Sequence, residues 1–227
     1  MRPILFALGK VNFYSYGFFT AFGFMAGGAV IDYLAKRKRL ITSRHTEYFV
    51  IDALLVSLIA AILASRLSYS IVYSLIFRFE PFNLLQGGFA YYPGLATGIW
   101  VFIYWIRRTE TNVLRWLDAL MVGILFGTGI SEIGGYLNDG QIAHLGALIG
   151  TAVLAGFAYR LFMAERTPGR TFFSSLLLLF ILYFFLGFWQ SEKVVWAGLN
   201  LTQWVSLISL VGIYAVWKRI TDGPKTT

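Results

Sequence analysis

The sequence predicts an all-α, polytopic membrane protein whose residues 1–227 form a single bundle of seven transmembrane helices. Of its 227 residues, 58% are hydrophobic and only 13% are charged, whereas about 25% of an ordinary soluble domain is charged. The mean hydropathy is +0.68, and a soluble chain of this length could not bury so much apolar surface. The apolar residues also gather into long runs, which sets the number of helices.

Seven apolar runs each approach the roughly 20 residues that a helix needs to cross a bilayer. The expected spans are Tyr14–Leu34, Phe49–Phe77, Gly88–Ile106, Leu117–Leu137, Gln141–Phe162, Thr171–Trp189 and Gly198–Trp217. The runs do not alternate between apolar and polar residues, which favours helices over a transmembrane barrel. The apolar stretch between Arg2 and Lys10 is too short for a cleaved signal peptide.

The distribution of basic residues predicts the orientation. Fourteen of the nineteen Lys and Arg residues lie in or next to one set of connections, counting Arg160 near the end of the span Gln141–Phe162. Four lie in the other set, and Arg66 lies well inside a span. Cytoplasmic loops carry the excess of Lys and Arg, so the N-terminus is expected outside and the C-terminus in the cytoplasm. The net charge of +8 is therefore a signal of topology, and no nucleic-acid partner is expected because no soluble basic domain is present.

Glycines four residues apart recur in three of the expected spans. The pairs are Gly23 with Gly27, Gly123 with Gly127, and Gly146 with Gly150. Small residues at this spacing let two membrane helices approach closely. Packing within the bundle is favoured here over packing between two copies of the chain.

Residue types exclude several chemistries. The chain has no cysteine and two histidines, so a disulfide, a cysteine nucleophile and a zinc site are not expected. No lysine lies within an expected span, which excludes a retinal Schiff base despite the seven helices. No Gly-rich phosphate loop of the nucleotide-binding type is present. We therefore expect neither a metal nor a cofactor.

Polar side chains within spans are costly, so their positions are informative. With the orientation fixed, most of them fall in the outer leaflet. The candidate site residues there are Tyr16, Arg66, Tyr69, Glu132, Gly134, His144, Gln190 and Gln203. Ionisable and hydrogen-bonding groups are therefore expected to converge in that leaflet.

One pair of charges is expected to meet in that leaflet. Arg66 follows Asp52 by fourteen residues, Glu132 follows Asp118 by fourteen, and both spans run in the same direction. Arg66 and Glu132 should therefore lie at similar depth, where an ion pair would offset much of the cost of burying either charge. Such a pair could line a cavity or be purely structural. Asp52 and Asp118 are expected to cap the cytoplasmic starts of their helices.

Six short motifs, in the same order and in matching spans, resemble those of the prolipoprotein diacylglyceryl transferases. They are Tyr16-Gly17, Asp52 with Ala64–Tyr69, Gly87–Phe89 with Gly94-Leu95, Leu117-Asp118, Ile133–Leu137, and Leu201–Leu207. The resemblance implies a seven-helix enzyme of the bacterial cytoplasmic membrane, with its N-terminus outside. It also implies transfer of a diacylglyceryl group from phosphatidylglycerol to the lipobox cysteine of a prolipoprotein.

The chain departs from the family pattern at its cationic positions. An arginine of the family falls on Glu132, a second arginine falls near Gln190, and a histidine falls on Tyr92 or Pro93. Four positions of the pattern are retained. These are Tyr16, Arg66, Gly134 and Gln203.

These features are compatible with three functions. In the first, the chain is a transferase in which Arg66 holds the headgroup of phosphatidylglycerol or another phospholipid, Tyr16 donates a hydrogen bond, and His144 replaces the missing base. His144 could instead be a helix-start residue bonded to Asp139 or to lipid. In the second, the chain is a catalytically degenerate lipid-binding or accessory protein on the same fold. A small-solute transporter is weaker, because the polar groups gather in one leaflet rather than at the midplane.

Overall fold

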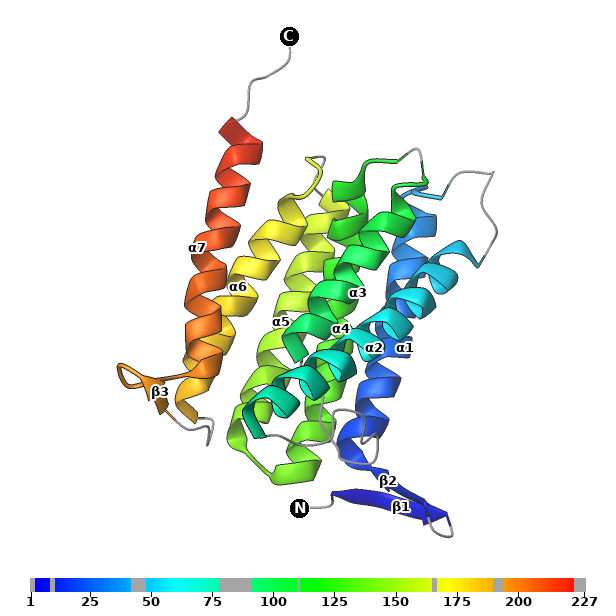
Figure 1. The fold of residues 1–227 in the computed structure, drawn as a ribbon. Helices are drawn as coiled ribbons and strands as arrows, with labels where there is room; N and C mark the ends of the chain where they lie inside the picture. The colour runs from blue at the N-terminus through cyan, green and yellow to red at the C-terminus, as the bar shows by residue number, and fades with distance from the viewer. Residues whose placement is uncertain are drawn as a thin grey trace. The chain divides into compact units, whose positions relative to one another are not determined.

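The computed structural model describes residues 3–8, 11–41, 48–77, 91–109, 111–164, 167–189 and 194–222. Helices occupy all seven of the runs expected from the sequence (Figure 1). They are α1 Ser15–Arg37, α2 Phe49–Phe77, α3 Tyr91–Ile106, α4 Val113–Asp139, α5 Ile142–Ala164, α6 Arg170–Leu186 and α7 Leu201–Asp222. A 3-10 turn, η1 Gly187–Trp189, continues α6 to the expected end of that span.

Five helices of the described residues are long and apolar enough to cross a membrane. They are Ser15–Arg37, Phe49–Ile71, Val113–Asp139, Ile142–Ala164 and Arg170–Trp189. The prediction of a helical, polytopic membrane protein is therefore confirmed. The apolar part of α3, Ala96–Ile106, is shorter, and α7 is not among the five. Spanning by all seven helices stays a prediction.

Two short hairpins stand beside the helices, and the sequence analysis did not predict them. In the first, β1 Ile4–Leu8 pairs antiparallel with β2 Val11–Tyr14. In the second, β3 Val194–Trp196 pairs with β4 Leu199–Asn200. The turn of the second hairpin, Ala197-Gly198, has φ of 51° and 76°, and two positive values match the twist of paired strands. The strands have two to five residues, so they could not be recognised as apolar runs of about 20 residues, the length that predicted the helices.

The described chain divides into two compact units. The first comprises Met1–Arg37 and Leu114–Thr227, and the second comprises Lys38–Val113. The first unit holds both hairpins and five helices, α1, α4, α5, α6 and α7, whereas the second holds α2 and α3. A single domain over residues 1–227 therefore stays a prediction.

In the first unit, glycines bring α1 and α4 into backbone contact. A Cβ atom at Gly27 would lie 2.6 Å from the carbonyl oxygen of Gly123, and one at Gly127 would lie 2.6 Å from that of Gly23. No side chain larger than hydrogen fits at these positions without displacing a neighbouring backbone. The expected close approach therefore occurs within the chain.

The third glycine pair packs differently. A Cβ atom at Gly146 would lie 2.6 Å from Leu186 Cδ2, and one at Gly150 would lie 2.5 Å from Leu182 Cδ2. Two leucines of α6 thus fill the hollows that the glycines leave on α5. The prediction that the glycine pairs serve packing within the chain is confirmed for all three pairs.

Small residues also join the two helices of the second unit. A Cβ atom at Gly94 of α3 would lie 2.8 Å from Ser65 Cβ, and one at Gly98 would lie 3.2 Å from Ala61 Cβ. Ser65 and Ala61 are four residues apart, as are the two glycines, so one face of α2 meets one face of α3. Arg66 is the residue after Ser65 on α2.

Asp118 caps a different helix from the one expected. It is buried on α4 and accepts backbone hydrogen bonds of 2.8 Å from the N–H groups of Gly169 and Phe172. Those groups lie at the start of α6, where no side chain of α6 itself makes a capping bond. The carboxylate therefore satisfies two N–H groups that would otherwise lack partners. Asp52, in contrast, is exposed in the first turn of α2.

The α1–α4 contact predicts a sharp difference between two glycine-to-alanine substitutions. Gly123→Ala places a methyl group against Gly27 and Ile31, and such overpacking costs about 1–3 kcal/mol. Gly156→Ala is the matched control, because no atom lies within 4 Å of its added Cβ. We expect a lowered thermal midpoint in detergent for Gly123→Ala alone. Equal midpoints would contradict the close contact.

The cap on α6 predicts that Asp118→Ala destabilises the protein. Two N–H groups lose their acceptor, and loss of a helix cap costs about 0.5–2 kcal/mol. Asp52→Ala removes an exposed carboxylate from the first turn of α2. It should lower the free energy of unfolding by much less than the loss of the cap does. Thermal unfolding of both variants, followed by circular dichroism, measures the difference. An Asp118→Ala midpoint no lower than that of Asp52→Ala would count against the cap.

Candidate functional site

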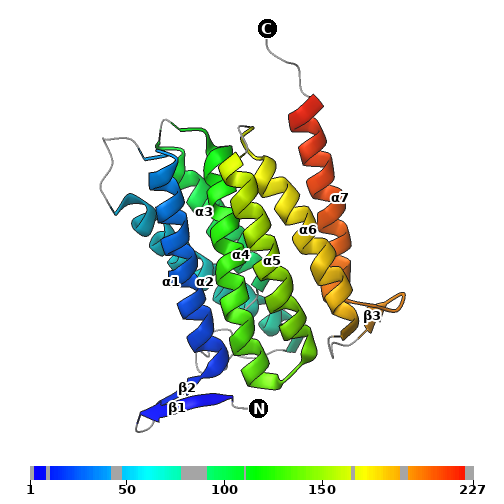
Figure 2. The same cartoon turned by 180° about the vertical axis from the view of Figure 1, so that it is seen from behind.

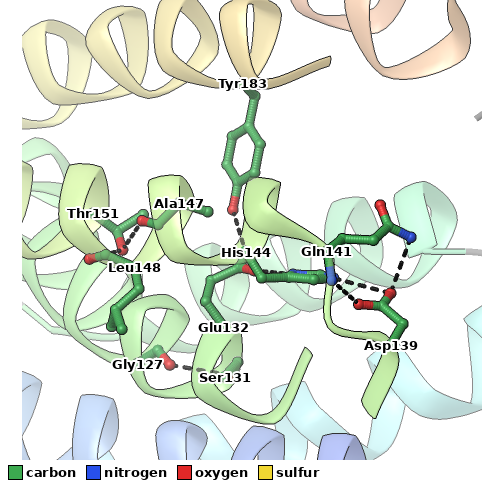
Figure 3. A network of polar contacts seen from close by, with 10 residues as sticks. All are labelled: Gly127, Ser131, Glu132, Asp139, Gln141, His144, Ala147, Leu148, Thr151 and Tyr183. Atoms are coloured by element: carbon green, nitrogen blue, oxygen red, sulfur yellow. Dashed lines mark hydrogen bonds and ion pairs between the residues drawn. The ribbon is translucent and has the colours of Figure 1, made fainter. Parts of the chain in front are cut away.

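A cluster of hydrogen-bonded polar groups joins α4, α5 and α6 at one end of the first unit (Figure 3). At its centre is Glu132 of α4, whose side chain is only 14% exposed. Its Oε2 lies 2.6 Å from Nδ1 of His144, and its Oε1 accepts a hydrogen bond of 3.0 Å from the hydroxyl of Tyr183. Both carboxylate oxygens therefore have partners, and the partners come from two other helices.

His144 lies between two carboxylates. Its second ring nitrogen, Nε2, is 3.3 Å from Oδ2 of Asp139. An ionised carboxylate can only accept hydrogen bonds, so both ring nitrogens carry hydrogen if Glu132 and Asp139 are ionised. The arrangement is then that of an imidazolium with a carboxylate on each side. Within the described ranges, no group of three or more acidic or histidine side chains is arranged to hold a metal ion.

A tight turn brings His144 back towards Glu132. Gly140 follows the last residue of α4 with φ of 73°, and its N–H donates to the carbonyl of Tyr136 at 2.8 Å. This left-handed conformation ends the helix and favours glycine. Asp139 then accepts bonds from the backbone N–H of Gln141 at 2.9 Å and from its Nε2 at 3.1 Å.

Gly135 makes room for the imidazole. A Cβ atom at this position would lie 2.5 Å from Nδ1 and 2.6 Å from Cε1 of His144. Sequence reasoning assigned no role to Gly135, nor to Tyr183. A hydroxyl within the otherwise apolar stretch Leu176–Leu186 was the available signal for Tyr183.

The start of α1 packs beside the same end of α4. A Cβ atom at Gly134 would lie 2.8 Å from the carbonyl oxygen of Ser15 and 3.1 Å from Cα of Tyr16. The side chain of Tyr16 is half exposed. The structure therefore brings together Tyr16, Glu132, Gly134 and His144 at one end of the first unit, as the sequence analysis expected for these four.

Gln203 is engaged in capping α7. Its Oε1 accepts from the N–H of Asn200 at 3.0 Å, and its own N–H donates to Oδ1 of Asn200 at 2.9 Å. This reciprocal pair is a capping box. The side-chain amides also donate to α6 and η1, from Asn200 to the carbonyl of Gly187 at 2.7 Å and from Gln203 to that of Phe184 at 3.3 Å. Gln203 is buried, so a role in contacting substrate stays a prediction.

The remaining candidates lie elsewhere. Arg66 and Tyr69 are half-buried on α2 in the second unit, and Gln190 lies outside the described residues. The ion pair between Arg66 and Glu132 stays a prediction. The bond between His144 and Asp139 confirms the contact that the sequence analysis offered as the alternative to a catalytic role.

The helices and this end cluster define a membrane-embedded protein with a polar site at one end of its helices. A family model described as prolipoprotein diacylglyceryl transferase matches residues 3–143. The chain therefore belongs to this family, in agreement with the resemblance found in the sequence.

Several relatives carry the name phosphatidylglycerol–prolipoprotein diacylglyceryl transferase. The chain is 28% identical to the protein of Proteus mirabilis over 141 residues, which are 60% of this chain and 47% of the relative. It is 29% identical to the protein of Clostridium tetani over 140 residues, which are 60% of this chain and 54% of the relative. It is 30% identical to the protein of Aeromonas salmonicida over 141 residues, which are 60% of this chain and 50% of the relative. The matched part of the chain thus spans about half the length of these curated relatives.

The matched region divides the cluster. It includes Glu132 and Asp139 of the cluster but ends one residue before His144. Tyr16, Arg66 and Gly134 also lie within it. The resemblance of Leu201–Leu207 to the family's seventh span lies beyond the match. The imidazole that pairs with Glu132 is therefore contributed by the part of the chain outside the matched region.

The cluster predicts the reactivity of His144. In Glu132→Gln, the ring loses the carboxylate at 2.6 Å, and a charge-assisted bond is about twice as strong as a neutral one. Diethylpyrocarbonate modifies the unprotonated imidazole, so modification of His144 should become several-fold faster. Mass spectrometry of the labelled peptides measures the rate, with His45 as internal reference.

Asp139→Asn is the matched control for that measurement. Its carboxylate is 3.3 Å from the ring and more exposed than that of Glu132, so the increase should be smaller. Modification of His144 at the wild-type rate in Glu132→Gln would exclude a controlling contact between the two side chains.

Proposed function

We propose that this protein transfers a diacylglyceryl group from phosphatidylglycerol to the lipobox cysteine of a prolipoprotein. Membership of the family over residues 3–143 is the observation that carries the proposal. The gathering of Tyr16, Gly134, Glu132 and His144 at one end of the first unit supports it further, because a headgroup needs polar partners in one place. The phospholipid and the signal peptide of the prolipoprotein are the expected partners.

The proposal includes the location and orientation of the chain. The protein crosses the bacterial cytoplasmic membrane seven times, with its N-terminus outside and its C-terminus in the cytoplasm. The excess of Lys and Arg in one set of connections supports this orientation. The cluster around Glu132 then faces the outer leaflet, where a secreted preprotein presents its cysteine.

The reaction requires a thiol nucleophile and a phosphate leaving group. The cysteine sulfur forms a bond to the terminal glyceryl carbon of the diacylglyceryl group, and the bond from that carbon to the phosphate oxygen breaks. Glycerol phosphate leaves with the bonding electrons, and the thiol proton passes to a base or to solvent. Catalysis therefore needs a cation near the phosphate and a proton acceptor near the sulfur.

Arg66 is the proposed partner of the phosphate. A guanidinium binds phosphate oxygens through two parallel hydrogen bonds, which a lysine cannot reproduce. Tyr16 has a half-exposed side chain in the first turn of α1, and it would donate a further hydrogen bond. Tyr69, Gln190 and Gln203 are proposed as additional headgroup contacts, with Gln203 acting through its place at the start of α7.

His144 is the proposed base, and its surroundings set a condition on that role. Both ring nitrogens face carboxylates, and a ring that carries hydrogen on both nitrogens has no lone pair for a further proton. The ring must therefore release one proton, to a carboxylate or to solvent, and leave that carboxylate before it can accept the thiol proton. The longer contact, 3.3 Å to Asp139, is the one that would open. Glu132 would then keep the ring oriented through Nδ1 while Nε2 receives the proton.

A second function is favoured by one specific observation. Glu132 stands where the resemblance expects an arginine, and its carboxylate is bonded to His144 and Tyr183. A carboxylate at that place would repel a phosphate. The alternative proposal is a catalytically degenerate lipid-binding or accessory protein that keeps the family fold.

One assay separates the two functions. Purified protein is incubated with phosphatidylglycerol micelles and a lipobox peptide, and release of glycerol phosphate is measured. A transferase releases it, and Arg66→Ala should reduce release by roughly a hundred- to thousandfold, the effect of losing one charged contact to a transition state. His144→Ala should also reduce it if the ring is the base.

Arg108→Ala is the matched control, because it removes an exposed guanidinium that lies over the rings of Tyr104 and Trp105. Its activity should equal that of the wild type. Binding of phosphatidylglycerol without any release would support the accessory function. Neither binding nor release would refute both proposals.

A further inference from the structure

The hairpin before α1 carries an exposed aromatic pair. Phe6 of β1 lies opposite Phe13 of β2, and their rings stack with centroids 4.7 Å apart and planes 20° apart. Phe6 is 44% exposed and Phe13 is 37% exposed. Their neighbours in the register, Ala7 and Asn12, form the next pair, and successive residues of a strand point to opposite faces. At these two pairs, one face of the hairpin is therefore aromatic, and the other carries a methyl group and an amide. By the same alternation Tyr14, the last residue of β2, lies on the second face and is 56% exposed.

The hairpin is attached to α1 in a defined way. The N–H of the buried Ser15, the first residue of the helix, donates to the carbonyl of Pro3 at 2.8 Å. The ring of Phe6 also packs edge-on against Phe18 of α1, with centroids 6.2 Å apart. Both views of the ribbon show the strands running sideways from the start of α1 rather than continuing its axis (Figures 1 and 2).

The aromatic pair is continuous with an exposed apolar face of α1. Phe18, Phe22 and Met25 are 45%, 50% and 62% exposed, and their spacing of four and three places them on one face of the helix. The opposite face carries Gly23 and Gly27, which contact α4. Because α1 is long and apolar enough to cross the membrane, its exposed apolar face meets lipid, and Phe6 extends that surface at the end of the helix.

The hairpin itself cannot lie in the hydrocarbon. Two strands leave unpaired backbone groups along both outer edges, and hydrocarbon offers them no partners. In water, the stacked phenyl rings would stay exposed. The zone between water and hydrocarbon satisfies both requirements, since apolar side chains such as Phe insert at the boundary of headgroups and acyl chains while polar backbone groups remain hydrated.

Charge in the sequence agrees with this location. The first 31 residues contain two cations, Arg2 and Lys10, and no Asp or Glu. A basic segment is attracted to the phosphates of a phospholipid surface.

We propose that the aromatic face of the β1–β2 hairpin docks on the phospholipid bilayer, with Phe6 and Phe13 inserted at the level of the headgroups and the upper acyl chains. The surface belongs to the leaflet next to the start of α1. Ser15 and Tyr16 pack on Gly134 beside the Glu132–His144 cluster, so the docked hairpin holds the edge of that cluster at the depth of the headgroups.

Single cysteines can test the proposal because the chain has none of its own. Phe6→Cys and Phe13→Cys each keep the opposite ring, and Ala7→Cys and Asn12→Cys are matched controls on the other face of the same strands. Each variant is labelled with an environment-sensitive fluorophore and reconstituted into vesicles of phosphatidylglycerol and phosphatidylethanolamine. Quenching by aqueous iodide and by lipids with a nitroxide near the headgroup is then measured.

The expected result is a split between the two faces. Labels at positions 6 and 13 should be quenched several-fold more by the nitroxide lipid than labels at 7 and 12, which iodide should quench more. Equal quenching on both faces, or stronger iodide quenching at 6 and 13, would overturn the proposal. Protection of positions 6 and 13 from both quenchers would also overturn it, because a protein partner or a second copy would then cover the face.

Further measurements serve as controls for this experiment. Circular dichroism and thermal unfolding of each labelled variant show whether the helices are kept, and a nitroxide scan of Phe18→Cys and Phe22→Cys on α1 supplies the expected deeper positions. Glycerol phosphate release by the same variants separates this inference from the transferase proposal. Hairpin labels in water together with full release would reject the docking alone.

Discussion

The backbone contact between α1 and α4 is the constraint on which the site depends. Gly23, Gly27, Gly123 and Gly127 allow the two helices to meet without intervening side chains, and Gly134 continues the contact to the first turn of α1. Membrane helices gain little from apolar burial against one another, so close van der Waals packing must supply the stabilisation. That packing fixes Tyr16 and the first hairpin beside the Glu132 end of α4.

Two sets of polar bonds then tie three further helices to this frame. Glu132 bonds to α5 through His144 and to α6 through Tyr183, while Asn200 and Gln203 bond the start of α7 to the end of α6 and to η1. Buried polar groups in an apolar setting are stabilising only when their partners are complete. The same bonds that position the candidate base therefore also hold the ends of the helices together.

Much of this arrangement could be predicted from the sequence, and the reasons differ between features. The helices were predictable because an apolar run of span length has few alternatives in a bilayer. The close packing of helices was predictable because glycines four residues apart lie on one face of a helix. The bond from His144 to Asp139 was one of the two contacts, to Asp139 or to lipid, that the sequence offered as the alternative to a catalytic role. The partner of Glu132 was not, because contacts between helices depend on rotation about each axis, which the predicted depth of a residue does not give. The hairpins escaped notice because their pairing is local and short.

The cap supplied by Asp118 bears on how the chain is made. The first turn of α6 has no acceptor of its own and takes one from α4, which is synthesised earlier. The acceptor is therefore synthesised before the N–H groups that it satisfies, so the cap can form as soon as α6 packs on α4.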